Sequence, residues 1–327
     1  AGRSLFSAFN PMDNDESVAG LETDGVANTN IIWHGGKLLA LEEGHAPFEL
    51  DPHTLESIGP HIYGGKLKGP MTAHPKIDPE NGEMLFFGYN ANGTISEHMT
   101  FSVVDRDGKL LRSESFEAPY AAMVHDFVVT RDHVIFPIMP LTGSLERAFK
   151  GGPVYAWEPQ KGSHIGIMPR NGSVKDLKWF RGEASYVFHP MNAFTGDDGK
   201  IVCDVCEYPE APLFPGVDGQ PGDPKKALAK LVRWTFDLNA QTDRYQVEQL
   251  DDLVCEFPRL DERRAGLSYR FGYFAGDTQP PEKVGGFNVI AAIDHQTGKL
   301  SSYDVGEGCA TSEPIFVPRS ASCEEGD

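Results

Sequence analysis

Apolar residues alternate with polar ones, or form short unbroken runs, along almost the whole chain. Runs rich in β-branched and aromatic residues occupy positions 30–43, 83–90, 99–105, 125–138, 200–208, 229–238 and 287–294. A two-residue period and this composition are typical of β-strands. The pattern therefore predicts an all-β protein.

Turn sequences that begin with aspartate separate these predicted strands. DPHTLES at Asp51, DPENGEM at Asp78 and DRDGKLL at Asp105 follow one another at intervals of 27 residues. Aspartate and asparagine side chains accept backbone N–H groups in tight turns, and glycine supplies positive φ. A long series of hairpins is compatible with a sandwich, a barrel or a propeller. The repetition favours a β-propeller built from four-stranded blades.

Two longer segments interrupt the repeat. Residues 140–175 and 207–228 are predicted to be loops, and the second, rich in Pro and Gly, is expected outside the sheets. KKALAKL at 225–231 could form one or two helical turns. No domain boundary is evident, so residues 1–327 are predicted to form a single, partial β-propeller domain with N-terminal and C-terminal parts missing.

Charge and composition exclude several classes of protein. Acidic residues outnumber basic ones by 48 to 29, giving a formal charge of −19. This balance argues against nucleic acid as a partner and against a polybasic lipid-binding patch. No stretch of about 18 apolar residues is present, and the first residues lack the apolar run of a secretory signal. A cytoplasmic location, with peripheral membrane contact left open, is expected.

The cysteines indicate a reducing compartment. There are five, an odd number, widely scattered along the chain. Cys203 and Cys206 have the spacing of a redox or zinc pair, but they lie in KIVCDVCEY, which alternates like a strand. We expect two cysteines on one face of a β-strand.

Three of the eleven histidines differ from the rest in their surroundings. His74, His125 and His189 each lie among apolar or small residues, next to Pro or Asp. A buried imidazole needs a partner for each ring nitrogen. A metal ion would satisfy one nitrogen, and a carboxylate or carbonyl the other. The spacings of 51 and 64 residues do not match a local zinc motif, but suit ligands from separate blades.

Several long phrases resemble one family. They include ANTNIIWHGGKLLALEEG, TAHPKIDPENGEMLFFGY, MVHDFVVT, WEPQKGSHIGIMPR, YVFHPMNAF, CEFPRLDERRAGLSYRFGY and TSEPIFVPR, in this order. Together they resemble the carotenoid cleavage oxygenases, which include apocarotenoid and lignostilbene dioxygenases. The resemblance implies a seven-bladed β-propeller, here incomplete, with about five blades present.

The resemblance also implies a metal site. Family members hold Fe(II) with four histidines, and His74, His125 and His189 match the first three, whereas the fourth is absent from this chain. Glutamates that hydrogen-bond the outer imidazole nitrogens match Glu43, Glu256 and Glu313. The neighbouring Glu42 competes with Glu43, which is preferred by its distance from the DPHTLE turn.

The implied function is that of an oxidoreductase. It is a dioxygenase that uses O2 to cut a C=C bond of an apolar, conjugated substrate into two carbonyl products. Stilbene-cleaving members commonly carry a lysine where this chain has Glu42, which favours an apocarotenoid or carotenoid. The segments 13–20 and 27–34 instead resemble the lignostilbene branch.

A catalytically silent, ligand-binding propeller is a further alternative, and the oligomeric state stays open. Candidate tunnel aromatics are Tyr120, Phe127, Phe188, Phe194 and Phe271.

Overall fold

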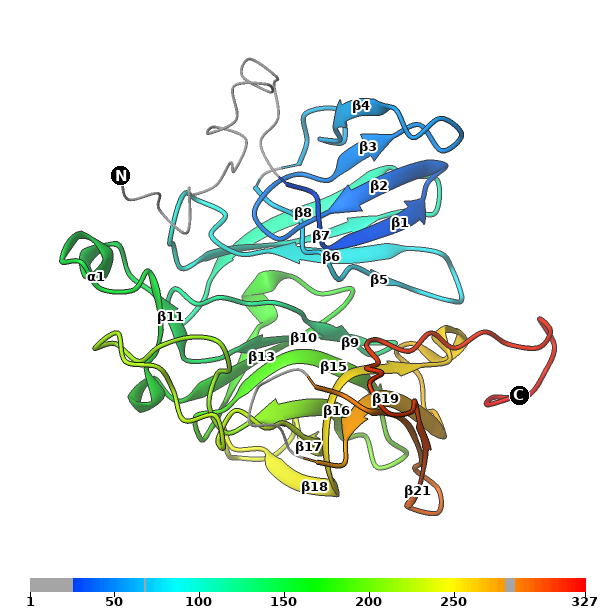
Figure 1. Ribbon diagram of the computed structural model, residues 1–327. Coiled ribbons are helices and arrows are strands. Elements are labelled where there is room, and N and C mark those ends of the chain that lie inside the picture. The colour runs from blue at the N-terminus through cyan, green and yellow to red at the C-terminus, as the bar shows by residue number, and fades with distance from the viewer. Residues whose placement is uncertain (1–25, 68, 280–285) are drawn as a thin grey trace. The chain divides into compact units, whose positions relative to one another are not determined.

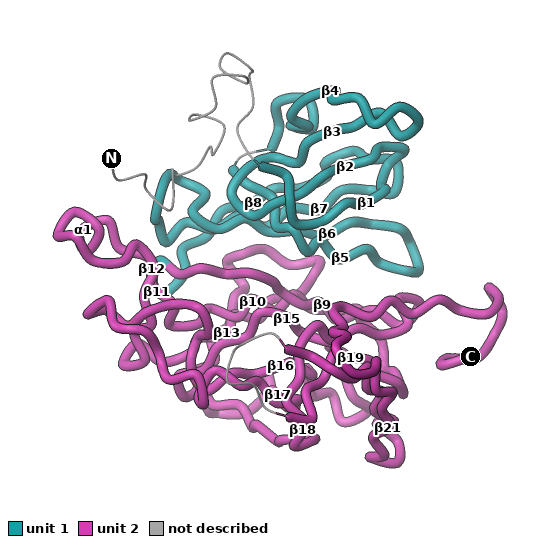
Figure 2. Tube along the Cα trace, in the orientation of Figure 1, with its two compact units in different colours: residues 1–121 teal, residues 122–327 magenta. Residues whose placement is uncertain are grey.

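A computed structural model describes residues 26–67, 69–279 and 286–327 (Figure 1). Segment 13–20, which resembles the lignostilbene branch, lies outside them. The chain divides into two compact units, residues 1–121 and residues 122–327, coloured separately in Figure 2. In both units the described residues form antiparallel sheets, as the alternating pattern predicts. That the two units belong to one domain stays a prediction.

Unit 1 contains two four-stranded antiparallel sheets, each a simple meander. The first has the order β1-β2-β3-β4 and the second the order β5-β6-β7-β8. The strands are β1 (Asn30–His34), β2 (Lys37–Leu41), β3 (Phe48–Leu50), β4 (Ser57–Pro60), β5 (Lys76–Ile77), β6 (Met84–Gly88), β7 (His98–Val104) and β8 (Leu110–Glu117).

The aspartate-led turns have their predicted form. The Asp51 carboxylate accepts hydrogen bonds from the backbone N–H groups of His53 at 2.9 Å and Thr54 at 2.8 Å. Asp78 does the same for Glu80, at 2.8 Å. These local bonds satisfy backbone donors that the sheet leaves unpaired, and they fix where each hairpin reverses.

Unit 2 begins with a third meander. Its sheet has the order β14-β13-β10-β9, formed by β9 (Val128–Val129), β10 (His133–Ile138), β13 (Ser163–Pro169) and β14 (Lys178–Gly182). Between β10 and β13 lie β11 (Leu141–Gly143), α1 (Leu145–Phe149), β12 (Tyr155–Trp157) and the 3-10 turn η3 (Pro159–Lys161), and η4 (Val174–Asp176) precedes β14.

The predicted loop 140–175 is therefore wrong in part. It contains β13, which is paired on both sides and has the burial pattern of a core strand. Gly166 and Pro169 hid this strand in the sequence, because both residues usually mark turns.

A seven-stranded sheet completes unit 2, in the order β15-β16-β17-β18-β19-β20-β21. Its strands are β15 (Tyr186–Thr195), β16 (Ile201–Tyr208), β17 (Lys230–Phe236), β18 (Gln246–Leu260), β19 (Phe271–Asp277), β20 (Val289–Asp294) and β21 (Lys299–Asp304), with η5 (Glu262–Arg264) between β18 and β19.

The long strand β18 joins two meanders into this one sheet. Its first residues pair with β17, Val254 pairs with both neighbouring strands, and the residues after it pair with β19 on either side of a register shift. With β18 counted once on each side, the sheet corresponds to two four-stranded blades, and the described residues contain five blades. None of the sheets in the described ranges closes on itself. An incomplete propeller, as predicted, accounts for this arrangement.

The core of unit 2 lies around these strands. Trp234, Tyr186, Phe180, Phe236 and Phe274 are almost completely buried. No helix in the described part of the chain has the length and apolar character needed to cross a bilayer.

Two smaller predictions fail. Residues 225–231 form no helix: a turn at 224–226 leads into β17, and the hydrogen bond from the Ala227 N–H to the Pro224 carbonyl closes it. Cys203 and Cys206 both lie on β16 and are buried and unbridged. They do not share a face, because residues three apart on a strand point to opposite sides.

Candidate metal centre

His189 lies near the beginning of β15, at an irregular part of the ladder. The pairing of β15 with β16 shifts register between Val187 and Pro190 and again between Pro190 and Asn192. Pro190 has no N–H to donate to the ladder, which accounts for a break at this point. Bulges re-aim side chains relative to a regular strand, and here the re-aimed residue is the histidine.

Glu256 lies on β18 at a second irregularity. The register with β19 shifts between Glu256 and Arg259, and Phe257 has a φ of +54°. Positive φ is uncommon for a bulky residue and marks a local backbone constraint. The Phe257 N–H donates to the Glu256 carboxylate, which satisfies a donor that the ladder no longer uses. This bulge directs the carboxylate toward β15.

The two bulged residues meet. The His189 Nδ1–H donates to Glu256 Oε2 at 2.6 Å, and the Glu256 side chain is only 4% exposed. Because a carboxylate can only accept, the bond places the proton on Nδ1 and leaves the Nε2 lone pair for another partner. Burial lowers the pKa of His189, but the charge and hydrogen bond of Glu256 outweigh it, and the net pKa shift is upward.

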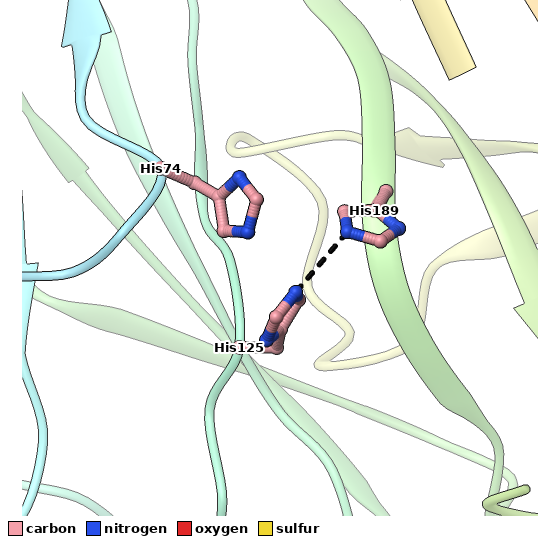
Figure 3. A group of neighbouring side chains, drawn as sticks. All are labelled: His74, His125 and His189. Carbon is pink, nitrogen blue, oxygen red and sulfur yellow. Dashed lines mark hydrogen bonds between the residues drawn. The ribbon is translucent and has the colours of Figure 1, made fainter. Parts of the chain in front are cut away.

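His125 presents its ring to the same point. It lies three residues before β9, in a segment held by the hydrogen bond from the Met123 N–H to the Leu141 carbonyl, 3.0 Å long. Its Nε2 lies 3.1 Å from the Nε2 of His189, shown as a dashed line in Figure 3. The rings are 4.9 Å apart and nearly perpendicular.

This donor set fits a metal ion. Two imidazole nitrogens at this separation repel unless a proton or a cation satisfies both lone pairs. Neighbouring ligands of one ion lie about 3 Å apart when metal–nitrogen distances are about 2.1 Å. The carboxylate behind His189 fixes its tautomer and raises its basicity, as carboxylates do behind metal-binding histidines.

Aromatic rings surround the histidine pair. Phe188 contacts His125 edge to face at 5.3 Å, and Phe257 lies 5.4 Å from His189. Phe188 in turn packs on Tyr208, and Phe257 on Phe287. These rings place apolar surface beside both imidazoles.

The predicted tunnel aromatics lie in different surroundings. Phe188 contacts the ring of a candidate ligand, His125. Phe127 is fully buried and stacks on Phe136, and Phe194 packs on Tyr269. Phe271 lies under the Arg270 guanidinium, and Tyr120 is buried in unit 1. Phe257 was not among the predicted aromatics, although it directly follows the predicted Glu256.

His74 and Glu43 both belong to unit 1. His74 lies in the loop before β5, where its N–H donates to the Thr72 hydroxyl at 3.1 Å and the Asn30 amide holds the Ala73 carbonyl at 2.8 Å. Glu43 accepts a hydrogen bond from the Tyr89 hydroxyl at 2.9 Å. Its competitor Glu42 accepts from the His45 ring.

Glu313 lies in unit 2 beyond the last strand. It accepts a hydrogen bond from Arg259 at 2.9 Å, and its side chain is 41% exposed. Its charge contributes to raising the pKa of His189. Its predicted hydrogen bond to a ligand imidazole stays a prediction.

Comparison with known proteins decides the family. The family model described as RPE65, retinal pigment epithelial membrane protein, matches residues 1–327. The chain belongs to this family of carotenoid oxygenases. The family resemblance inferred from the phrases is therefore confirmed.

Individual family members agree with this assignment. Isoeugenol monooxygenase of Pseudomonas putida is 42% identical over 337 residues, covering 100% of this chain and 70% of that protein. Lignostilbene dioxygenase of Pseudomonas brassicacearum superposes with a TM-score of 0.88 at 38% identity, covering 94% of this chain and 66% of that one. Cobalt-substituted ACO of Synechocystis superposes with a TM-score of 0.78 at 29% identity, covering 93% of this chain and 65% of that one.

These members of the RPE65 family are longer than the present chain. The chain spans about two thirds of their length. The two solved structures are propellers of the carotenoid oxygenase type, so the five meanders are blades of that fold.

Proposed function

We propose that this chain is part of a non-haem iron(II) oxygenase that uses O2 to cut a C=C bond of a conjugated apolar substrate, giving two carbonyl products. The observation that carries the proposal is the pair of imidazoles, 3.1 Å apart, backed by the buried Glu256. Membership of an oxygenase family, in which relatives are named monooxygenase and dioxygenase, supports the reaction class.

His74 is proposed as a third ligand. His74, His125 and His189 together could hold a metal ion, and an RPE65-family structure described as cobalt-substituted supports a metal in the family. Glu43 and Glu313 are proposed to orient further ligand imidazoles, as Glu256 orients His189. A fourth histidine and the identity of the metal as Fe(II) are parts of the same proposal.

Each residue has a defined task in this proposal. The neutral imidazoles supply nitrogen lone pairs, and Glu256 holds the proton on Nδ1 so that Nε2 stays available. Because neutral imidazoles add no charge, iron(II) held by these histidines would keep its full charge, and it would supply the redox chemistry with O2. Phe188 and Phe257 exclude water and give a planar, apolar surface on which a conjugated substrate can lie.

The substrate class is best described as an alkene conjugated to an aromatic ring. Relatives named for isoeugenol and lignostilbene are 42% and 38% identical to this chain. From the sequence, an apocarotenoid was favoured, because this chain has Glu42 where stilbene-cleaving members commonly have lysine. Glu42 accepts a hydrogen bond from His45 within unit 1, which gives it a local role. The apocarotenoid, which was the first choice from the sequence, becomes the second candidate here because of these relatives.

Iron content of ligand variants tests the metal site. The chain would be purified without oxygen, supplied with Fe(II), and assayed for bound iron as wild type and as His74→Ala, His125→Ala and His189→Ala. We expect near-stoichiometric iron in the wild type and at least about a tenfold loss in each variant. His53→Ala, in an exposed turn, is the matched control.

Turnover then tests the reaction and the substrate. Isoeugenol, a hydroxystilbene and an apocarotenal would be supplied with O2, and carbonyl products measured. Aldehyde from the first two supports the aryl-alkene proposal, whereas product from the apocarotenal alone would replace it. Absence of iron binding and of products, with the fold intact, would contradict the oxygenase proposal and leave a ligand-binding propeller. Cytoplasmic location and peripheral membrane contact remain predictions.

A further inference from the structure

A cleft of about 620 Å³ lies in unit 2 and shares no residue with the histidine pair or with the rings around it. Its walls come from η3, the beginning of β13, the end of β14 and Arg244, which lies shortly before β18. Volumes of roughly 300–1,000 Å³ are typical of small-molecule sites. The proposed oxygenase makes no use of this cleft.

The cleft collects positive charge in an acidic protein. Lys161, Arg181 and Arg244 line it together with one carboxylate, that of Glu183. In the whole chain acidic residues outnumber basic ones by 48 to 29, so the balance in the cleft is reversed. A hollow lined by charge of one sign raises the local concentration of ligands of the other sign.

The backbone places the two arginines side by side. The Arg181 N–H donates to the Asp243 carbonyl at 2.7 Å, and residues 181 and 244 form a parallel bridge. The Arg181 guanidinium also binds the Asp243 carboxylate, with 2.6 Å between Nε and Oδ2. Among the described residues, the Arg244 side chain makes one hydrogen bond, 3.5 Å long, to the Arg181 carbonyl. One carboxylate therefore serves two guanidinium groups, and Arg244 has no counter-charge of its own.

Lys161 brings a second cation that can bind a ligand. It is the last residue of η3, where its N–H donates to the Glu158 carbonyl at 3.0 Å. The Glu158 carboxylate is engaged elsewhere, because it accepts from the Thr142 hydroxyl at 2.8 Å. Within the ranges that the structure describes, the Lys161 ammonium has neither a hydrogen bond nor an ion pair. Its donors are therefore available to an acceptor in the cleft.

The sum of these charges defines the kind of ion that fits. Arg181 and Asp243 neutralise each other, and Glu183 forms no ion pair in the described part of the chain. Lys161 and Arg244, taken with Glu183, leave one positive charge uncompensated. A monoanion balances this charge, and a carboxylate matches the planar guanidinium of Arg244.

The other walls of the cleft favour a polar ligand. No Phe, Tyr or Trp of the described ranges lines it, and its apolar lining is limited to Pro159, Ala184 and two glycines. Gln160 and Glu183 are exposed and add groups that form hydrogen bonds. The Glu183 carboxylate would repel an anion, but it can accept a hydrogen bond from a hydroxyl group of the same ligand.

We propose that this cleft binds a small monocarboxylate that carries several hydroxyl groups, such as a sugar acid. The carboxylate of the ligand accepts hydrogen bonds from Arg244 and Lys161, and one of its hydroxyl groups donates to Glu183. Binding requires no metal ion, so this site stands or falls separately from the proposed oxygenase activity.

Calorimetric titration of the metal-free chain with D-gluconate tests this site. We expect saturable binding to the wild type, weakened at least about tenfold in Lys161→Gln and in Arg244→Gln, because each removes a charged hydrogen-bond donor. Hexanoate lacks the hydroxyl groups and sorbitol lacks the carboxylate, and each is expected to bind at least about tenfold more weakly than gluconate. Glu183→Gln is expected to narrow the difference between gluconate and hexanoate, because it removes the repelling charge and the carboxylate that accepts the hydroxyl group.

Two control variants distinguish binding in this cleft from a general effect of charge and from binding at the histidine pair. Lys175→Gln removes an exposed cation from η4, outside the cleft, and is expected to bind gluconate like the wild type. His189→Ala is expected to retain this binding. A circular dichroism spectrum like that of the wild type would show that each variant is folded. The proposal is wrong if gluconate binding does not saturate, if Lys161→Gln and Arg244→Gln bind it normally, if hexanoate or sorbitol binds as tightly, or if His189→Ala abolishes binding.

Discussion

Two buried carboxylates of the same seven-stranded sheet are used in opposite ways. Asp204 on β16 accepts two hydrogen bonds from Arg233, at 2.7 and 2.8 Å, and one from the Tyr269 hydroxyl at 2.6 Å. Glu256 on β18 holds a neutral ring, His189, whose second nitrogen faces another histidine. All of these hydrogen bonds of Asp204 come from donors of the protein itself. The hydrogen bond of Glu256, in contrast, leaves the second nitrogen of His189 able to bind a ligand.

The difference follows from the backbone around each group. On the side of β17, Asp204 pairs in regular register, directly opposite Arg233. On the side of β15 it pairs with Asn192, where a register shift ends, but its counter-charge comes from the regular side. Glu256 and His189 each lie at a register shift. Regular pairing brings a charged residue to its counter-charge and stabilises the sheet, while a bulge turns a polar side chain out of the ladder. Thus stability and function are separated within one sheet.

Removal of Asp204 is expected to have the largest effect on stability. Asp204→Ala leaves the Arg233 guanidinium without its counter-charge, and breaking a buried pair in this way typically costs about 3–5 kcal/mol. Urea-induced unfolding would measure the loss. The exposed Asp198→Ala is the control, and a change equal to the control would contradict a structural role for the Asp204 network.

Substitution of Glu256 is expected to affect metal binding more than folding. Glu256→Gln keeps the size of the side chain but removes the charge that holds His189, and changes of this kind typically cost about 10–100-fold in metal affinity. Competition with a chelator would measure the affinity. Asp204→Asn, if folded, is expected to keep the affinity within about threefold. Equal losses in both variants would remove the distinction between the two networks.

Glu207 offers the smallest and most specific test. Burial of this residue of β16 raises its folded-state pKa above the ordinary value of 4.5. Between the pKa of the unfolded chain and the higher pKa of the folded chain, the carboxyl is ionised in the unfolded state but still protonated in the folded state. The free energy of unfolding of the wild type therefore falls as the pH rises through this interval. Glu207→Gln cannot titrate, and its stability relative to the wild type is therefore expected to rise over that interval. Unfolding measured from about pH 4 to about pH 8 would show a flat difference if the carboxyl were solvated.

Much of the fold could be predicted because its signals are local. The alternation in segments such as 200–208 requires only that one face be buried, and the turn at Asp51 is held by its own side chain. β13 was missed because its glycine and proline are local signals of turns, while its pairing on both sides depends on distant residues.

The candidate site was predicted by resemblance and could not be derived from local pattern. Nothing in CEFPRL indicates that Phe257 adopts positive φ, because the bulge depends on how β18 pairs with β19. For the same reason the contact between Phe257 and His189 was missed. The close approach of Cys206 and Cys255, with their sulfur atoms 3.4 Å apart, likewise requires the three-dimensional structure.

The 15-residue strand β18 also has a consequence for the order of events in folding. Glu256 lies 67 residues from His189, and its strand β18 is held in place by pairing with β17 on one side and β19 on the other. Contacts of such sequence separation form late, because chain entropy must be lost before they contribute. In a refolding experiment we therefore expect capture of a coloured metal such as cobalt(II) by the histidine pair to follow recovery of the sheet signal; capture that coincides with that signal would contradict this expectation.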